Sequence, residues 1–379
     1  MRRTIHLLLA VTVAAAVTAV PRRAIAAPAS PPVAPPVGKP VRIVSLSFKS
    51  ASLERIAGII DAEGRKGVDL VSLPEAWRGP DVVETLSGPT LTTMSQLARR
   101  HRTYVACPLY RQAEGARINS AVLTDRTGAL AAVYDKVFPY WNEFDLQPPA
   151  VPGKHDVAVH EADFGKVGLA ICYDAKFPEV FQRLRDKGAE LVLLSSAYSG
   201  FTELQAFALL HHYPIVTSTL TGDVVAYDMT GALLLDERGT GDVTVSRLTL
   251  DMDRTIYHYN FNLEKRDRLL RERAGDVRLA VDMPREEWFV LEAKRPGVSA
   301  RALAREYGLE ELRAYKDRSR VGIDARRGFS FSERYGGYPG RAADAEVRLP
   351  ATDAHFGPVK DYVEPVPAPD YRHAPAAAV

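Results

Sequence analysis

The sequence contains few cysteines, only Cys107 and Cys172 in 379 residues. At most one disulfide can form, which excludes a framework of several disulfides. Each cysteine ends or interrupts an apolar, strand-like run, so burial in a core is favoured over a bridge between them. For Cys107 we expect only this structural role, because a buried free cysteine packs as a small apolar side chain.

The sequence also lacks a strong charge of one sign. There are 49 Lys and Arg against 47 Asp and Glu, a formal net charge of +2, and four of the arginines lie in the first 26 residues. A nucleic-acid-binding chain would carry a clear basic surplus or a basic stripe. We therefore expect no nucleic-acid partner.

A long apolar run occurs only once, at residues 5–20, after a basic start and before the small residues "AIA". This pattern predicts a secretory signal peptide over residues 1–26, cut after Ala26, and therefore an exported protein, periplasmic or extracellular, without stable membrane insertion after cleavage. Because the run is short for a membrane span, an uncleaved anchor is the alternative. The arginine pair near the start leaves Sec and twin-arginine export both open. Residues 27–40, rich in Pro and Ala, should form a linker.

From Val41 to Arg254 strand-like and helix-like segments alternate, and 46% of the whole chain is hydrophobic, enough for a large core. The alternation predicts a layered α/β fold. Two halves share one plan of strand, helix, strand and hairpin. The hairpin segments "LTDRTGALAAVYDK" and "AYDMTGALLLDERG" are alike enough to indicate a weak internal repeat.

The composition changes after this region. We predict a helical C-terminal extension over residues 255–329, with one or two amphipathic helices around Gly308, and an irregular tail over residues 330–379. The stretch "SARALAREYGLEEL" faintly resembles half of a helix-turn-helix. In an exported chain that becomes slightly acidic once the four arginines of residues 1–26 are removed, a packing or oligomer-forming role is favoured over DNA binding.

Three chemically capable side chains follow directly where apolar strands end: Glu75, Lys136 and Cys172. In α/β folds that edge supplies rigid positions and access. A thiol is mostly neutral near pH 7 and needs a base or a nearby cation to attack carbon. A carboxylate can take its proton, and a lysine can stabilise an oxyanion. Together the three side chains could carry out acyl transfer.

These segments resemble the carbon–nitrogen hydrolase (nitrilase) superfamily. The similarity rests on "LVSLPEAW", "NSAVLTDRTGALAAVYDKVFP" and "KVGLAICYDAKFPEVFQRLRDKGAELVLLSSAYSG", in this order. The resemblance implies a four-layer α-β-β-α sandwich. It also implies that Glu75 is the general base, Lys136 the oxyanion-stabilising cation and Cys172 the nucleophile, with the backbone N–H of Tyr173 completing the oxyanion hole.

Many members carry a second glutamate after the lysine, and Glu143 is the candidate here. Tyr140, Trp141 and Tyr198 are expected to line the substrate pocket, which favours an apolar or aromatic acyl group. The resemblance implies no cofactor and no metal, and it implies a homodimer or a higher homo-oligomer.

The "CYD" and "FPE" motifs look like the amide-hydrolysing branches of the superfamily. We therefore predict an amidase that cleaves a small linear amide or N-carbamoyl compound through a cysteine thioester and releases ammonia or an amine. The alternatives are a nitrilase, a thiol hydrolase that uses His211 or His212 as base, and a non-catalytic exported binding protein on the same fold.

Overall fold

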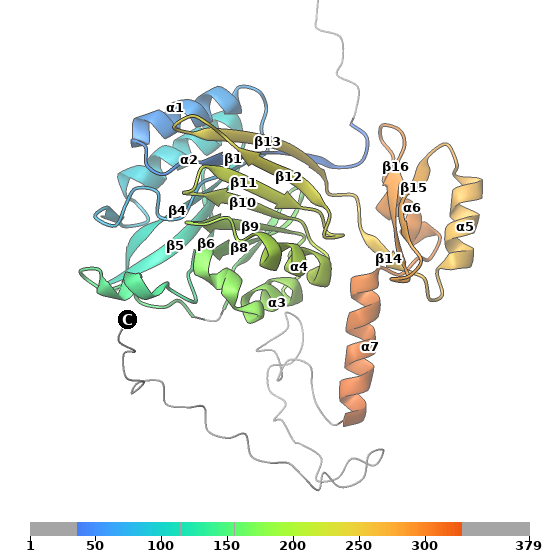
Figure 1. Ribbon diagram of the computed structural model, residues 1–379. Coiled ribbons are helices and arrows are strands. Elements are labelled where there is room, and N and C mark those ends of the chain that lie inside the picture. The colour runs from blue at the N-terminus through green and yellow to red at the C-terminus, as the bar shows by residue number, and fades with distance from the viewer. Residues whose placement is uncertain (1–35, 114, 155, 328–379) are drawn as a thin grey trace, which may run out of the picture. The chain divides into compact units, whose positions relative to one another are not determined.

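A computed structural model describes residues 36–113, 115–154 and 156–327, which are coloured in Figure 1. The predicted signal peptide, the linker up to residue 35 and the predicted tail lie outside the described residues. Within the described part of the chain, no helix has both the length and the apolar character that crossing a membrane requires.

Two large β-sheets form the main body. The first sheet has the strand order β13-β1-β2-β4-β5-β6, and β3 pairs with β4 at its side. Its strands are β1 (Pro40–Ser47), β2 (Leu70–Ser72), β3 (Val83–Glu84), β4 (Tyr104–Ala113), β5 (Ala116–Thr124), β6 (Leu130–Asp135) and β13 (Thr244–Asp251).

The second sheet has the order β12-β11-β10-β9-β8-β7. Its strands are β7 (Val159–Ala162), β8 (Gly165–Ile171), β9 (Leu191–Ser196), β10 (Ile215–Thr219), β11 (Asp223–Tyr227) and β12 (Leu233–Arg238).

The internal repeat read from the sequence appears as a repeat of strand pairing. In the first sheet β1, β2 and β4 are parallel, and β5 and β6 follow antiparallel. In the second sheet β8, β9 and β10 are parallel, and β11 and β12 follow antiparallel. The turns of the two hairpins also share a hydrogen bond. In each, the carboxylate of an aspartate, Asp125 or Asp228, accepts from the backbone N–H two residues later.

The two sheets pack face to face and helices cover their outer faces (Figure 1). Helices α1 (Leu53–Gly64) and α2 (Pro89–His101) cover the first sheet, and α3 (Pro178–Asp186) and α4 (Phe201–His211) cover the second. Between the sheets, Ser45 Oγ donates to Thr217 O at 2.6 Å. The predicted mixed α/β fold is confirmed.

The extension differs from the helical segment expected from the sequence. Besides α5 (Leu263–Glu272), α6 (Ala300–Glu306) and α7 (Leu312–Arg327), it contains an antiparallel sheet in the order β14-β16-β15. The strands are β14 (Ile256–His258), β15 (Val277–Met283) and β16 (Trp288–Ala293). Gly308, at a φ of 74°, separates α6 from α7 as expected.

Candidate active site

The structure brings the four predicted catalytic side chains together. Glu75 lies three residues after β2, Lys136 follows β6 and Cys172 follows β8. Strands β2 and β6 run in the same direction in one sheet, and β8 belongs to the facing sheet, so the three strand ends meet where the two sheets pack. Glu143 joins them from the short 3-10 helix η1 (Trp141–Asp145) in the loop after β6.

Lys136 lies between two carboxylates. Its Nζ donates to Glu75 Oε1 at 2.7 Å and also to Glu143 Oε1. The three side chains are almost completely buried. Asn119 links the carboxylates from the other side, with Nδ2 at 2.8 Å from both Glu75 Oε1 and Glu143 Oε2. Each charge is therefore paired and hydrogen-bonded, as burial of ions requires.

Cys172 occupies a constrained turn. It has a φ of 45°, in the left-handed region that residues other than glycine rarely adopt, and it begins the 3-10 helix η2 (Cys172–Lys176). The Glu75 carboxylate and the backbone of Ala197 both influence the pKa of its thiol, the first raising it and the second lowering it. Backbone strain of this kind is concentrated at functional sites, where the surrounding structure holds it in place.

Burial is the largest influence on the thiol. It raises the pKa of Cys172 to about 12, the Glu75 carboxylate adds to this rise, and the Lys136 ammonium opposes it. Desolvation would lower the pKa of Lys136, but Glu75, Cys172 and Glu143 together raise it above the usual lysine value. In the resting site the thiol is therefore protonated and the lysine charged, so attack by sulfur requires a base. Glu75 lines the same cavity as Cys172 and its carboxylate influences the thiol, so it can serve as that base.

Asp174 fixes the turn that presents Cys172. Its fully buried carboxylate accepts hydrogen bonds from Ile171 N at 2.9 Å, from Tyr134 OH at 2.6 Å and from Phe138 N at 3.0 Å. Asp174 thus joins the nucleophile turn to the segments on both sides of Lys136. It is a positioning residue that the sequence analysis did not identify as part of the site.

The site opens into a cavity of about 1240 Å³. Its walls combine catalytic, apolar and charged side chains. They include Phe48, Lys49, Glu75, Trp77, Arg78, Tyr110, Lys136, Tyr140, Asn142, Glu143, Leu146, Cys172, Leu220 and Asp242.

Of the three aromatic residues expected in the pocket, Tyr140 lines it. Trp141 does not, because it points outward, 77% exposed, against Phe144. Tyr198 is not among the lining residues, and its ring lies 5.4 Å from Lys176 Nζ. The ring of Tyr173 packs edge-on against Tyr140 at 5.1 Å, beside the nucleophile turn.

The sequence analysis also missed Asn119 and Tyr110. Tyr110 OH donates to Glu143 Oε2 at 3.4 Å. Both residues lie in strands of the first sheet, opposite each other in the β4–β5 pair. A signal was present for Asn119, since an amide two residues before the apolar run at 121–123 needs hydrogen-bond partners if it is buried.

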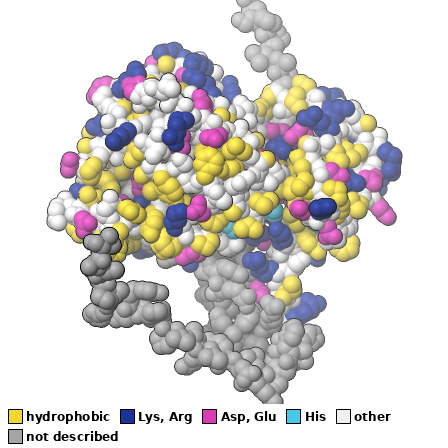
Figure 2. Space-filling view, in the orientation of Figure 1, with side chains coloured by type: hydrophobic (Ala, Val, Ile, Leu, Met, Phe, Trp, Pro, Cys, Tyr) yellow, Lys and Arg dark blue, Asp and Glu magenta, His cyan; other side chains and the backbone are white. Residues whose placement is uncertain are grey.

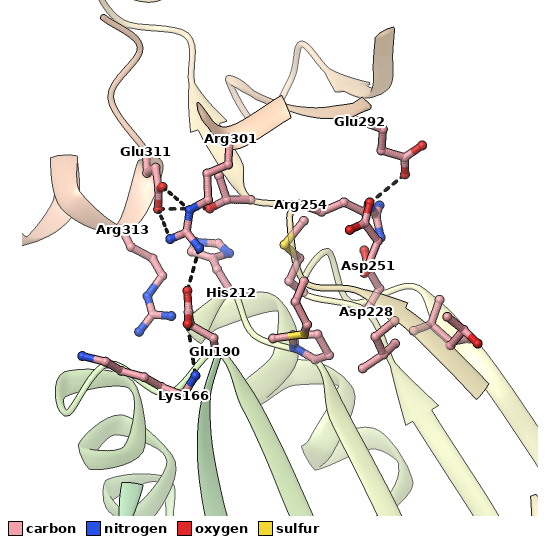
Figure 3. Close-up of a pocket in the computed structure, with 18 residues that line it drawn as sticks. Lys166, Glu190, His212, Asp228, Asp251, Arg254, Glu292, Arg301, Glu311 and Arg313 are labelled. Atoms are coloured by element: carbon pink, nitrogen blue, oxygen red, sulfur yellow. Dashed lines mark hydrogen bonds and ion pairs between the residues drawn. The ribbon is translucent and has the colours of Figure 1, made fainter. Parts of the chain in front are cut away.

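His211 and His212 take no part in this site. The His211 ring stacks on Phe207, and His212 lines a second cavity, of about 480 Å³, to which Cys172 does not contribute (Figure 3). That cavity lies where the extension contacts the main body. Arg301 of α6 bridges Glu190 and Glu311 there, both at 2.6 Å, and Arg313 of α7 donates to the backbone of Ala189 at 2.7 Å. Cys107 is a buried free thiol, as expected.

The two histidines make the protein sensitive to acid. Burial, together with the charges of Arg185, Arg313 and Lys316, lowers the pKa of each to about 3. A pKa lowered on folding stabilises the protein fully above the unfolded value of about 6.5, and that stability is lost as pH falls towards 3. At pH 4.5 we expect a loss on the order of 2 kcal/mol for each histidine, measured by denaturant unfolding at several pH values.

The matched variants for this experiment are His211→Phe, which keeps the stack on Phe207, and His212→Asn, which suits the left-handed φ of 56° at that position. Each variant should flatten the dependence of unfolding free energy on pH between 6.5 and 4.5. An unchanged slope in both variants would show that other groups cause the acid sensitivity.

Comparison with known proteins adds to this geometry. The family model described as carbon-nitrogen hydrolase matches residues 41–252, which include both large sheets but not the extension. The deaminated glutathione amidase of Synechocystis sp. is 27% identical over 197 residues, 45% of this chain and 72% of that protein. The formamidase of Allorhizobium ampelinum is 29% identical over 146 residues, 35% of this chain and 41% of that protein.

Solved structures resemble the chain at lower sequence identity. An amidase from Nesterenkonia sp. superposes with a TM-score of 0.49 and 20% identity, over 57% of this chain and 92% of that chain. Nit3 of Saccharomyces cerevisiae, a member of branch 10 of the nitrilase superfamily, superposes with a TM-score of 0.48 and 18% identity, over 56% of this chain and 91% of that chain.

Proposed function

The chain belongs to the carbon–nitrogen hydrolase family, and we propose that it is an amidase acting on a small linear amide or N-carbamoyl compound through a thioester at Cys172. The observation that carries the proposal is the placement of Cys172, Glu75 and Lys136 on the wall of one cavity. The amidase names of the similar proteins support the same reaction type. A nitrile substrate is the alternative that the same side chains could serve.

In the first half of the reaction Cys172 Sγ attacks the carbonyl carbon while Glu75 takes the thiol proton. The carbonyl oxygen becomes an oxyanion, which Lys136 and the backbone N–H of Tyr173 stabilise. Glu75 then gives its proton to the leaving nitrogen. The C–N bond breaks, ammonia or an amine departs, and the acyl group remains on sulfur as a thioester.

In the second half a water molecule attacks the thioester carbon and Glu75 takes one of its protons. The C–S bond breaks as the tetrahedral intermediate collapses, and Glu75 returns the proton to Cys172 Sγ. The carboxylic acid leaves and the site is restored. Glu143 accepts a hydrogen bond from Lys136 throughout and so keeps the ammonium group aimed at the oxyanion.

The experiment that tests the proposal is intact-mass spectrometry after rapid quenching with a panel of amides, N-carbamoyl compounds and nitriles. The wild type should carry an acyl group whose mass identifies the substrate, and Cys172→Ala should carry none. If no adduct and no turnover appear across the panel while ligands still bind, the non-catalytic binding protein is the correct alternative.

We further propose that the protein is exported after removal of residues 1–26. N-terminal sequencing of protein secreted by its host should begin at Ala27. An intact N-terminus in the membrane fraction would favour the anchored form.

We also propose a homodimer that uses the face formed by α4 and β12. Gln205 Nε2 of α4 donates to Gly231 O before β12 at 3.0 Å, so the two elements are neighbours. Figure 2 shows hydrophobic side chains on this side of the molecule. Such side chains, unusually exposed for their type, are Phe201, Leu209, Leu210, Leu233 and Leu234.

Leu210→Glu should shift the protein from dimer to monomer at micromolar concentration in sedimentation velocity experiments, because it buries a charge in the apolar contact. Leu130→Glu, at an exposed leucine on the edge strand β6, is the matched control and should leave the dimer intact. A Leu210→Glu protein that still sediments as a dimer would place the interface elsewhere.

A further inference from the structure

Arg117 is a buried cation that takes no part in the site described above. It lies at the start of β5, is only 5% exposed, and is not among the described residues that line the catalytic cavity. Within the described part of the chain no carboxylate pairs with it, and its Nε has no acceptor. A charge this deeply buried needs other compensation. Its remaining hydrogen bonds therefore indicate what the side chain does.

The guanidinium group of Arg117 joins two loops of the active site. Its Nη1 donates to Pro80 O at 2.9 Å, and its Nη2 donates to Gln147 O at 2.9 Å. Pro80 lies in the loop that follows Glu75, and Gln147 lies in the loop that follows Glu143. Because the donors belong to one rigid, planar group, the two hydrogen bonds fix the spacing of these loops.

The backbone of Arg117 holds the Glu143 loop a second time. Arg117 O accepts from Val151 N at 2.9 Å, and the preceding residue, Ala150, donates its N–H to Glu143 O at 2.9 Å. The guanidinium carbon also lies 5.3 Å from the centre of the Tyr110 ring, whose hydroxyl group donates to Glu143. Arg117 thus contacts the supports of Glu143 on both its backbone and its side-chain side.

The Glu75 loop needs such a support. Ala76, directly after Glu75, has a φ of 37°, in the left-handed region that residues other than glycine rarely adopt. Strained backbone of this kind persists where the surrounding structure holds it. Gly79 N donates to Ala76 O at 2.8 Å and closes the turn, and the bond from Arg117 to Pro80 ties the turn to the sheet. Without that bond the turn can relax and move Glu75.

We infer that Arg117 is a positioning residue, which fixes the loops of Glu75 and Glu143 together and so keeps both carboxylates in contact with Lys136. The inference rests on the proposed amidase function, since Glu75 is the base of that reaction. It adds a residue outside the cavity on which turnover depends. Arg117 does not touch the substrate, so it acts only through the two glutamates.

The first test is turnover of the best amide by Arg117→Gln. We expect kcat to fall about 10²-fold, because a small displacement of reacting groups has an effect of this size. KM should change less than about threefold, since no contact with the substrate is lost. Arg117→Lys keeps the charge but cannot donate to both carbonyl groups with one fixed geometry, so it should recover only part of kcat.

A double-mutant cycle tests whether Arg117 acts through Glu143. In the Glu143→Gln protein, Arg117→Gln should cost at least about threefold less in kcat than in the wild type, because coupled residues have non-additive effects. The matched control is Arg313→Gln. The Arg313 guanidinium also donates to two backbone carbonyl groups, those of Ala189 and Arg185, at 2.7 and 2.8 Å, but outside the catalytic cavity. Its effect on kcat should be the same in both backgrounds.

Alkylation of Cys172 by iodoacetamide tests the Glu75 loop without any substrate. The Glu75 carboxylate raises the pKa of the Cys172 thiol, so a displaced Glu75 leaves a more reactive thiol. Arg117→Gln should therefore be alkylated faster than the wild type at a given pH. In the Glu75→Gln background Arg117→Gln should add no further increase, and Arg313→Gln should not change the rate.

The outcomes distinguish this inference from the proposed function. An equal loss of kcat in both backgrounds, or an unchanged alkylation rate, overturns the inference that Arg117 holds both glutamates and leaves the amidase function standing. If no amide is turned over and no adduct forms on Cys172, the amidase function fails, and the alkylation rates still decide whether Arg117 positions Glu75. If urea unfolding shows that Arg117→Gln is not folded, Arg117→Lys carries the same comparisons.

Discussion

Replacing Glu75 with glutamine is expected to change two properties of the site in opposite directions. Amide turnover should fall by about 10²- to 10⁴-fold, the usual contribution of a general base, because glutamine cannot take the thiol proton. Alkylation of Cys172 by iodoacetamide should become faster at a given pH. The Glu75 carboxylate raises the pKa of Cys172 and Lys136 lowers it, so removal of the carboxylate leaves the lysine effect unopposed and increases the thiolate fraction.

The opposite changes separate a base from a structural residue. A collapsed site would lose both reactivities, whereas a missing base loses only turnover. Glu143→Gln is the matched control, since it removes an equal charge from beside Lys136, whereas the carboxylate that raises the pKa of the Cys172 thiol is that of Glu75. A Glu75→Gln protein with turnover within tenfold of the wild type would assign the base to another group.

The reacting groups could be predicted from the sequence because of their positions at the ends of apolar strands. Glu75, Lys136 and Cys172 each follow an apolar strand, and parallel strands of one sheet end at one edge. The sequence alone does not determine that the strand ends of two different sheets meet, since Lys136 and Cys172 belong to facing sheets. The family resemblance supplied that pairing, and it also pointed to Glu143.

The supporting residues could not be predicted in the same way. Asn119 bonds to carboxylates 24 and 44 positions away, and Asp174 bonds to Phe138 and Tyr134, 36 and 40 positions away, so no local pattern indicates which partners they have. The sequence also does not show which way a side chain points. Tyr140 and Trp141 are neighbours in one loop, yet one lines the cavity and the other points outward.

In the extension, the pattern of apolar residues did not distinguish strand from helix. The run "WFVLEA" became β16, not a helix, and five of its six residues are buried. A short strand buried on both faces lacks the alternation that identifies half-buried strands, and by pattern alone it cannot be distinguished from a buried helix segment. The strand is held by pairing on both sides, with β14 and with β15.

Replacing Lys136 with methionine is expected to destabilise the fold as well as to abolish turnover. The carboxylates of Glu75 and Glu143 would stay buried without their cation, and breaking a buried ion pair in this way costs about 3–5 kcal/mol. Loss of the oxyanion-stabilising charge should lower kcat by about 10²-fold or more. Urea unfolding and turnover of the best amide are the two measurements.

A second variant separates these effects, because the two carboxylates contribute differently to them. Adding Glu143→Gln to Lys136→Met removes one of the two uncompensated charges. Asn119 Nδ2 can still donate to the side chains at positions 75 and 143. Unfolding free energy should therefore recover in part, whereas turnover should not recover at all, since the oxyanion still lacks its cation. If turnover returned together with stability, Lys136 would act only by holding the fold, and the oxyanion would be stabilised by the backbone alone.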